Sequence, residues 1–125
     1  MDRFLNLAAR ILMSQIFIIS GIGKITGYAG TQAYMAKMGV PGALLPLVII
    51  TEVGGGLALL VGFQTKWVAL ALAGFTVLSA LIFHLNFNDQ MQMINFMKNL
   101  AMAGGLLMFV RYGAAAPSID KGGRL

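Results

Sequence analysis

Charged side chains are scarce in this chain of 125 residues, of which 58% are hydrophobic and only 10% charged. In a soluble domain about a quarter of the residues are charged. The nine basic and four acidic residues are too few to cover the large surface of so short a chain. The composition therefore predicts that lipid, rather than water, surrounds most of the molecule.

The chain also has no cysteine and a single histidine, His84. Without cysteine it forms no disulfide and has no thiolate nucleophile and no thiol redox centre. One histidine excludes a bis-histidine haem held by one chain and argues against a zinc site. We therefore expect no metal and no covalently bound cofactor. The net charge of +5 does not predict a nucleic-acid partner, because the basic residues sit mainly at the ends of apolar segments.

Long apolar segments are what the sequence has instead. Four of them approach the ~20 residues that cross the hydrocarbon core of a bilayer, at residues 5–25, 43–63, 67–85 and 94–112. They predict an all-α membrane protein, a four-transmembrane-helix bundle formed by residues 1–125 as a single domain. Only Gln64–Lys66 separates the second segment from the third, which forces an antiparallel hairpin.

The first connection is the longest and predicts a short helix of its own. Gly30 and Thr31 offer a helix start, and Gln32–Met38 can form about two turns that end at Gly39. Its apolar residues fall on one side, which is typical of a helix lying in the membrane interface. The first segment could also be read as a signal peptide. It is full length and no small-residue cleavage site follows it, so we expect it to stay as the first span.

The orientation follows from the basic residues near the ends of the segments. One side carries Arg3, Lys66, Arg111, Lys121 and Arg124, and the other carries Lys24 and Lys37. Because basic residues accumulate on the cytoplasmic side, both termini are predicted to be cytoplasmic.

Several charged residues fall inside the predicted spans. Glu52 lies near the middle of the second span, Lys98 lies in the fourth and Arg10 in the first. An unpaired charge at such depth costs ~2.5–3.5 kcal/mol on insertion scales. We therefore expect these groups to face the bundle interior and each other.

The spacing of the polar residues supports this expectation. They share helix faces with small and apolar residues, namely Arg10, Ser14, Phe17, Gly21 and Lys24 in the first span, Glu52, Gly55, Gly56 and Leu59 in the second, and Asn95, Lys98, Asn99, Met102 and Gly104 or Gly105 in the fourth. With both termini inside, Lys24 and His84 fall near the outer helix ends, and Lys98 and Glu52 lie deeper. These groups are predicted to converge on one cavity in the outer half of the bundle.

The charges predicted around this cavity do not balance. Glu52 is a single carboxylate facing Lys24, Lys98 and a titratable His84, with Arg10 as a further cation or as a side chain that snorkels to the headgroups. An excess of donors favours an anion or an electron-rich oxygen, such as a quinone carbonyl, a phenolate, a sulfur oxyanion or a lipid phosphate. The alternative is that Glu52 and a lysine form a purely structural lock between helices, with Asn99 as an interhelical hydrogen-bond donor.

The pattern as a whole resembles the DoxX family of small bacterial membrane proteins. The matching features run along nearly the whole chain: Arg10, Phe17–Lys24 (FIISGIGK), Tyr34 and Met35, Gly39–Pro41 (GVP), Glu52–Gly55 (EVGG), Gly62 and Phe63, His84, Ile94–Ala101 (INFMKNLA), and Gly104 with Gly105. The resemblance implies a four-helix protein of the bacterial inner membrane, linked through some relatives to thiosulfate:quinone oxidoreduction and to quinone, catechol or oxidative-stress handling. The chain departs from many relatives at Leu85–Phe87, where a second histidine is common, so no two-histidine mechanism is implied.

These observations leave two main hypotheses. In the first, the chain is a membrane redox component, a quinone-linked oxidoreductase or a subunit of one, that binds a quinone or phenol. Lys24, Lys98, Asn99 and Arg10 would hold the ligand oxygen and Glu52 or His84 would exchange its proton. A redox-enzyme partner or diffusible reductant would supply electrons.

In the second hypothesis, the chain is a non-catalytic scaffold or assembly partner for a redox enzyme, and a pair between Glu52 and Lys98 is structural. Transport of a small anion or lipid is a third reading. It is disfavoured because four short helices leave little room for alternating access unless the chain forms a homo-oligomer.

Overall fold

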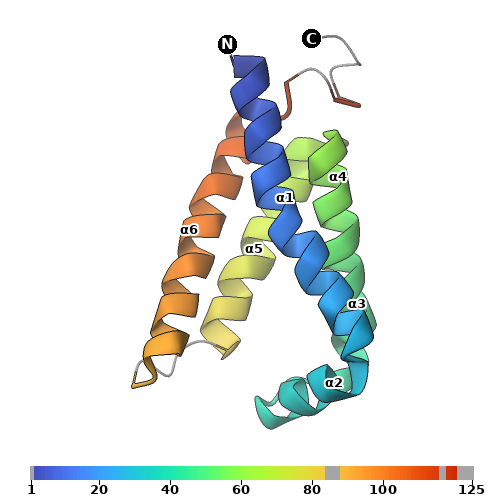
Figure 1. The fold of residues 1–125 in the computed structure, drawn as a ribbon, viewed down its shortest axis with the longest axis vertical. Helices are drawn as coiled ribbons and strands as arrows, with labels where there is room; N and C mark the ends of the chain where they lie inside the picture. Colours follow the sequence, from blue (N-terminus) through green and yellow to red (C-terminus); the bar gives the residue numbers. More distant parts are fainter. Residues whose placement is uncertain (1, 84–87, 116–117, 121–125) are drawn as a thin grey trace.

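The computed structural model describes residues 2–83, 88–115 and 118–120 of the chain. In chain order its elements are α1 (Asp2–Thr26), α2 (Tyr28–Lys37), the 3-10 turn η1 (Gly42–Leu44), α3 (Leu45–Ile49), the π-helical turn η2 (Ile50–Gly54), α4 (Gly55–Val61), α5 (Thr65–Phe83) and α6 (Gln90–Tyr112). Figure 1 shows how these helices stand side by side.

Four helical stretches are long and apolar enough to cross a membrane, at Arg3–Thr26, Gly42–Val61, Thr65–Phe83 and Gln90–Tyr112. They confirm the predicted all-α fold with four spans. The fourth begins earlier than predicted because Asp89 caps α6, where its carboxylate accepts a hydrogen bond of 3.0 Å from the backbone N–H of Met91. The prediction overlooked this cap because it followed hydropathy alone.

The second span is one continuous stretch built from η1, α3, η2 and α4. Pro46 lies in its first turn, where a proline leaves no helical hydrogen bond unmade. The π-helical turn Ile50–Gly54 was not predicted. Such turns are rare and occur often at functional sites, and this one contains Glu52.

A short helix between the first two spans is present as α2, but it begins at Tyr28 rather than near Thr31; its position in the membrane interface stays a prediction. The chain stays nearly helical through Gly27, whose carbonyl accepts hydrogen bonds of 2.9 Å from both the backbone N–H and the hydroxyl of Thr31. As predicted, the helix stops before Gly39, which has a positive φ of 83°. The helix lies across the end of the bundle, below the ends of the spans in Figure 1.

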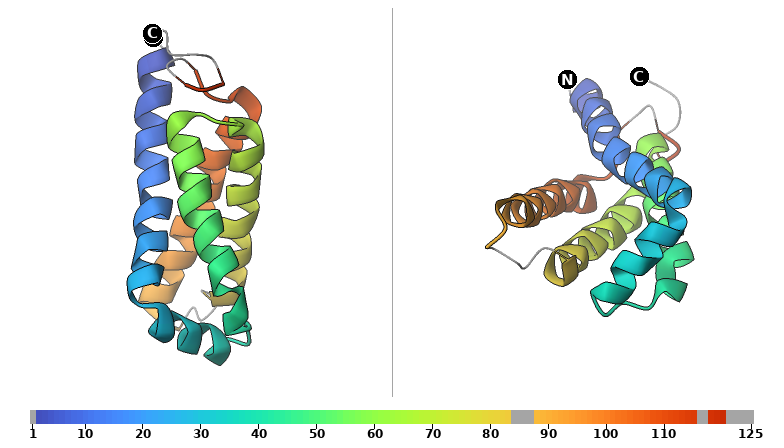
Figure 2. Two further views of the ribbon diagram at one scale, coloured as in Figure 1. Left: turned by 90° about the vertical axis from the view of Figure 1, so that its right-hand side faces the viewer. Right: turned by 60° about the horizontal axis from the view of Figure 1, so that its bottom comes forward.

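The spans associate as two antiparallel pairs. α5 packs along α6, and α1 packs along α3, η2 and α4, whereas α1 and α6 touch each other little. The pairs stand close together at the start of α1 and diverge toward α2, as Figures 1 and 2 show. This divergence leaves room for a cavity between the two pairs in the half that holds α2.

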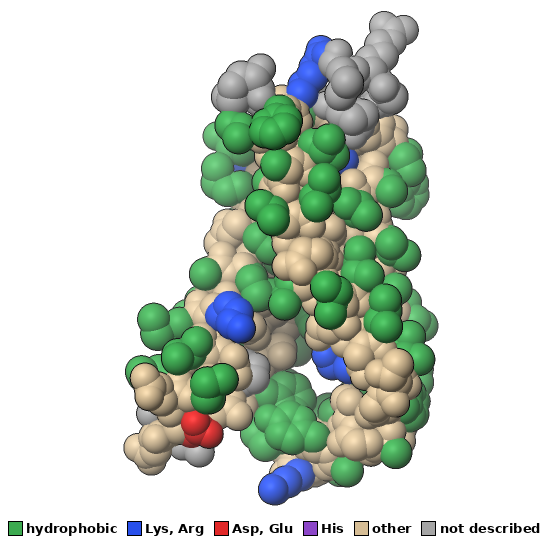
Figure 3. All heavy atoms as spheres, viewed as in Figure 1, with side chains coloured by type: hydrophobic (Ala, Val, Ile, Leu, Met, Phe, Trp, Pro, Cys, Tyr) green, Lys and Arg blue, Asp and Glu red, His purple; other side chains and the backbone are tan. Residues whose placement is uncertain are grey.

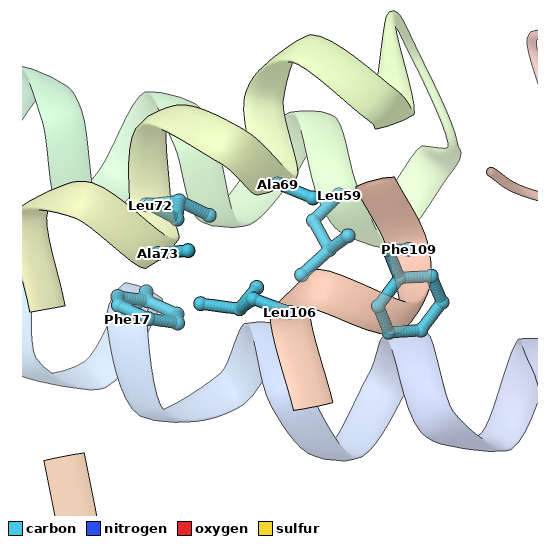
Figure 4. Close-up of a cluster of buried hydrophobic side chains, with 7 residues drawn as sticks. All are labelled: Phe17, Leu59, Ala69, Leu72, Ala73, Leu106 and Phe109. Carbon is cyan, nitrogen blue, oxygen red and sulfur yellow. The ribbon is translucent and has the colours of Figure 1, made fainter. Parts of the chain in front are cut away.

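The closed half contains the apolar core. Its buried side chains come from α1, α4, α5 and α6 and are Phe17, Leu59, Ala69, Leu72, Ala73, Leu106 and Phe109, shown in Figure 4. Lipid tails are as apolar as these residues, so close packing rather than escape from water holds the helices together.

Arg10 links several elements at the end of the bundle where α1 begins and α6 ends, which we call the terminal end. Its side chain is completely buried, and its guanidinium donates hydrogen bonds of 3.2 Å to the carbonyl of Leu60 and 3.4 Å to that of Ala115. Nearby, the Asn6 amide donates to the carbonyl of Gly113 at 3.1 Å and accepts from the N–H of Ala115 at 2.9 Å. These bonds join α1, α4 and the segment after α6.

The same segment also pairs with the hairpin between α4 and α5. The backbone N–H of Ile119 donates to the carbonyl of Val61, and that of Asp120 donates to the carbonyl of Gly62, both at 2.9 Å. The Asp120 carboxylate accepts from the N–H groups of Gln64 and Thr65, at 2.8 and 2.9 Å, at the start of α5. The start of α5, the end of α4 and the segment after α6 are therefore joined at one end of the bundle.

Gly62 is the position in this cluster where only glycine fits. Its φ is +72°, and an added Cβ would lie 2.7 Å from Nη1 of Arg10. We expect Gly62→Ala to destabilise the bundle by roughly 1–2 kcal/mol or more, because it adds a clash to the cost of a left-handed conformation. Gly74→Ala is the matched control, since a Cβ there meets nothing within 4 Å.

The measurement is unfolding of each variant in mixed detergent micelles with increasing dodecyl sulfate. Gly74→Ala should match the original chain or exceed it slightly, because alanine favours a helix. Equal unfolding midpoints for the two variants would contradict the arrangement described for Arg10 and Gly62.

Candidate functional site

A cavity of about 550 Å³ lies in the open half of the bundle. All four spans and α2 contribute to its walls, and its polar lining residues are Ser20, Lys24, Thr31, Tyr34, Thr51, Glu52, Thr76, Ser79, Asn95, Lys98 and Asn99. Its volume lies within the ~300–1,000 Å³ of small-molecule sites. The cavity occupies the half away from the termini, which is where the sequence placed the converging polar groups.

An ion pair forms one wall of the cavity. Nζ of Lys24 lies 2.7 Å from Oε1 of Glu52, and it also donates a hydrogen bond of 2.7 Å to the Ser20 hydroxyl one turn earlier in α1. The Glu52 side chain is 6% exposed and that of Lys24 is 28% exposed. The carboxylate is therefore buried, while the ammonium group stands at the edge of the cavity.

Close contact between two backbones brings this pair together. A Cβ at Gly21 would lie 3.2 Å from Cβ of Glu52 and would overlap the side chain of Val53. Only a glycine at this point lets α1 approach η2 so closely. Gly21 and Lys24 share one face of α1, so the approach that admits Glu52 also aims Lys24 at it.

The opposite wall comes from α5 and α6. The Asn99 side chain donates a hydrogen bond of 3.2 Å to the backbone carbonyl of Thr76, which links these two helices. Lys98, one residue earlier, is exposed and lies at the rim of the cavity. Among the described residues it has no acidic partner.

Two aromatic rings close the cavity beside α2. Tyr34 of α2 stacks on Phe83 at the end of α5, with ring centroids 5.5 Å apart and an interplanar angle of 23°. Both residues line the cavity. This stack joins α2 to the far helix pair.

A second hollow of about 780 Å³ runs between α1 and α6. Its lining is mostly aliphatic and aromatic, and Asn6, Gln15 and Lys98 are the residues in it with an amide or charged side chain. Although it is larger, it lacks the convergence of charges found in the first. The first cavity is therefore the candidate site.

The structure brings together four of the predicted site residues, Glu52, Lys24, Lys98 and Asn99, around one cavity. It does not bring Arg10 there, because that side chain is fully buried at the terminal end and neither lines the cavity nor reaches the headgroups. His84, the other predicted proton-exchanging residue, lies outside the described residues.

One expected contact is corrected. The sequence suggested Lys98 as the partner of Glu52, but its partner is Lys24. Lys24 lies on the helix that packs against η2, whereas the cavity separates α6 from η2. The role of Ser20 was missed, although its position four residues before Lys24 on the same helix face could have indicated it.

No group of three or more metal-binding side chains of the His, Cys, Asp or Glu type occurs within the described part of the chain. The described residues that line the cavity supply two ammonium groups, one carboxylate, amides and hydroxyls. These groups can hold an oxygen atom and move protons.

Comparison with known proteins agrees with this architecture. Residues 5–85, which contain the first three spans, match the family model named DoxX. The chain belongs to the DoxX family. The chain has four candidate spans. Lys24 and Glu52, which form the ion pair, both lie within the region that the family model matches.

Two curated relatives come from Escherichia coli strain K12. The chain is 57% identical to inner membrane protein YqjF over 115 residues, covering 92% of this chain and 88% of YqjF. It is 36% identical to inner membrane protein YphA over 125 residues, covering 94% of this chain and 89% of YphA. No solved structure gives a significant match. With its four apolar spans, this DoxX-family chain is a multi-pass protein of the bacterial inner membrane.

The ion pair leads to a prediction about stability. We expect Lys24→Met to destabilise the bundle by roughly 1–3 kcal/mol, because it leaves Glu52 buried without its charged partner. The double variant with Glu52→Gln should recover much of this loss, since no uncompensated carboxylate then remains. Dodecyl sulfate unfolding of the single and double variants measures the coupling between the two side chains.

Lys98→Met is the control for this cycle, because Lys98 makes no salt bridge with a described residue. It should unfold like the original chain. A coupling free energy of zero between Lys24 and Glu52 would show that the ion pair does not hold α1 to the second span.

Proposed function

We propose that this DoxX-family protein binds a quinone or a phenolic compound in the cavity and acts as a membrane redox component. The observation that carries the proposal is an ion pair between a buried carboxylate and a partly exposed ammonium group at the wall of a cavity of about 550 Å³, inside the membrane-spanning part of the chain. A lipid-soluble ligand with a polar oxygen suits an apolar cavity that has a few convergent polar groups.

The ammonium group of Lys24 is suited to bind the ligand oxygen. It carries three N–H donors. One of them donates to Ser20, and the charge of the group is paired with Glu52. Since the side chain is partly exposed at the cavity edge, a further donor can reach a ligand. A positively charged donor favours an oxygen that gains negative charge when a quinone is reduced or a phenol is deprotonated.

Glu52 is suited to exchange the proton. It is the one acidic residue that lines the cavity among the described residues, and it contacts the ammonium group that would hold the oxygen. Lys98 and Asn99 stand on the opposite wall and can bind a second oxygen across a ring. The protein side chains supply protons and hydrogen bonds, so a redox-enzyme partner or a diffusible reductant must supply the electrons.

A scaffold role is the second candidate, and one observation favours it. The carboxylate of Glu52 is already paired with Lys24, so the ion pair can hold α1 to the second span without any ligand. In this case the chain would hold a redox enzyme in the membrane. The two candidates differ in what remains bound when the protein is purified in native lipid.

We expect a quinone or phenol to co-purify with the protein in native-lipid particles, where mass spectrometry identifies it. Glu52→Gln keeps the size of the side chain and leaves an amide oxygen or nitrogen in place of the carboxylate beside Lys24, so the bundle should fold. The loss of a charged hydrogen-bonding group should weaken binding of a short-tailed benzoquinone about tenfold or more. Lys98→Met should also weaken binding of the benzoquinone.

Lys66→Met is the matched control for Lys98→Met, because Lys66 is an exposed lysine at the start of α5, at the closed end, and does not line the cavity. It should bind like the original chain. If Glu52→Gln and Lys98→Met also bind the benzoquinone as tightly as the original chain, the proposal fails. A stoichiometric protein partner with no small molecule would favour the scaffold.

A further inference from the structure

We infer that the ligand of this cavity carries a long hydrocarbon tail, and that the tail leaves the cavity sideways and lies in the groove between α1 and α6. The inference rests on the proposed function and defines the substrate class more narrowly, as an amphipathic lipid with an oxygen-bearing head. The groove is the hollow of about 780 Å³ lined by α1 and α6.

The cavity and the groove adjoin each other. Ile16, Lys98 and Met102 line both of them, so these residues stand at the passage from one to the other. α1 and α6 touch little, and the surface in Figure 3 is hollowed between the helix pairs in the half that holds α2, with basic side chains at its edge. A ligand in the cavity therefore has a lateral way out toward the bilayer.

The two hollows differ in chemistry in the way that an amphipathic molecule does. The cavity has the ion pair and the amides of Asn95 and Asn99, whereas the groove is lined mainly by residues such as Leu12, Met108 and Phe109. The head would lie among hydrogen-bonding groups and the tail among aliphatic ones. Each part of the ligand would then contact groups of its own polarity.

The groove is also long enough for a lipid tail. From Lys98 to Tyr112 it follows α6 for fourteen residues, which is roughly 21 Å at 1.5 Å per residue. This exceeds half of the ~30 Å hydrocarbon core. By contrast, the cavity itself lies within the size range of sites that hold one small molecule, so a long tail must lie outside it.

Lys98 stands where the head and tail would meet. It lies eight residues into α6, roughly 12 Å from the start of the helix, and is exposed at the rim shared by both hollows. No described carboxylate pairs with it. An ammonium group at such depth needs an electron-rich partner, and a ligand head passing this point supplies one.

The affinity for the tail will not come from the hydrophobic effect, because a lipid tail gains little by moving from bilayer to groove. Instead, the groove decides whether a tailed ligand can enter at all. A side chain that fills the groove should exclude a long-tailed ligand and leave a short-tailed ligand unaffected. This difference separates the inference from the proposed function.

The test uses Ala9→Phe, which places a ring in the groove far from the ion pair. Its matched control is Ala71→Phe, at an exposed alanine of α5 that lines neither hollow. Binding is measured in lipid nanodiscs with two benzoquinones that share a head group, one with a single isoprene unit and one with a long isoprenoid chain. Ala9→Phe should weaken binding of the long-tailed quinone about tenfold or more. It should leave the short-tailed quinone within a factor of about two, a small free-energy change on the same scale.

The outcomes are distinct. If neither quinone binds to the original chain, the proposed function fails and the inference fails with it. If the short-tailed quinone binds and Ala9→Phe has the same effect on both quinones, only the inference is overturned. A groove occupied by a second copy of the chain would also overturn it, and would appear as a dimer that Ala9→Phe dissociates.

A second measurement does not depend on a variant. A quinone with a photoreactive diazirine at the end of its tail is bound to the original chain, irradiated and mapped by peptide mass spectrometry. Labels should concentrate near Ala9 and Leu12 of α1 and near Met108 and Tyr112 of α6. Labels spread evenly over the exposed face of α5, around Leu70 and Leu81, which line neither hollow, would contradict the inference.

Discussion

The ion pair between Lys24 and Glu52 is the interaction on which the rest of the open half depends. A carboxylate in the middle of a membrane span is costly unless a cation meets it, so the position of Glu52 requires α1 to lie against the second span. Gly21 permits that approach and the π-helical turn carries the carboxylate at the contact. One wall of the cavity is fixed as a result, while the facing wall on α6 is set by a different helix pair.

The buried polar groups at the two ends of the bundle find their partners in different ways. At the terminal end the guanidinium of Arg10 is surrounded by backbone carbonyls and completely buried, so it acts as a structural clamp. At the other end the polar groups are only partly satisfied by the protein, and the helices diverge around them. A rigid, closed end and an open, polar end in one small bundle are what a binding site requires from its scaffold.

Much of this arrangement could be predicted from the sequence, because buried charges in lipid have few acceptable places. The spacing of Arg10, Ser14, Phe17 and Gly21 predicted one face of α1, and all four are buried. The predicted grouping of Glu52 with Lys24 also holds. The orientation in the membrane stays a prediction from the positive residues.

Other features could not be predicted, for physical reasons. A π-helical turn differs from an α-helical one by a shift in hydrogen bonding that leaves no trace in hydropathy. The face of α6 was harder to assign, because Ala103, Leu106 and Phe109 pack inward while equally apolar neighbours face lipid. In a soluble protein the inward face would be the more apolar one, but in a bilayer both are alike. The choice between Lys24 and Lys98 as partner of Glu52 depended on this same helix packing.

The charge balance of the open half gives the reason to treat it as a binding site rather than a lock. A lock needs one cation for one carboxylate, and Lys24 already meets that need. Lys98 is then an additional ammonium group at membrane depth, exposed where the cavity and the groove meet and without an acidic partner among the residues described. Structure alone gains nothing from such a group, since a lysine there is costly and an apolar residue would pack as well. A ligand with an electron-rich oxygen would give this lysine a partner and offset the cost of its position. The proposed function therefore rests on the cavity and not on the ion pair alone.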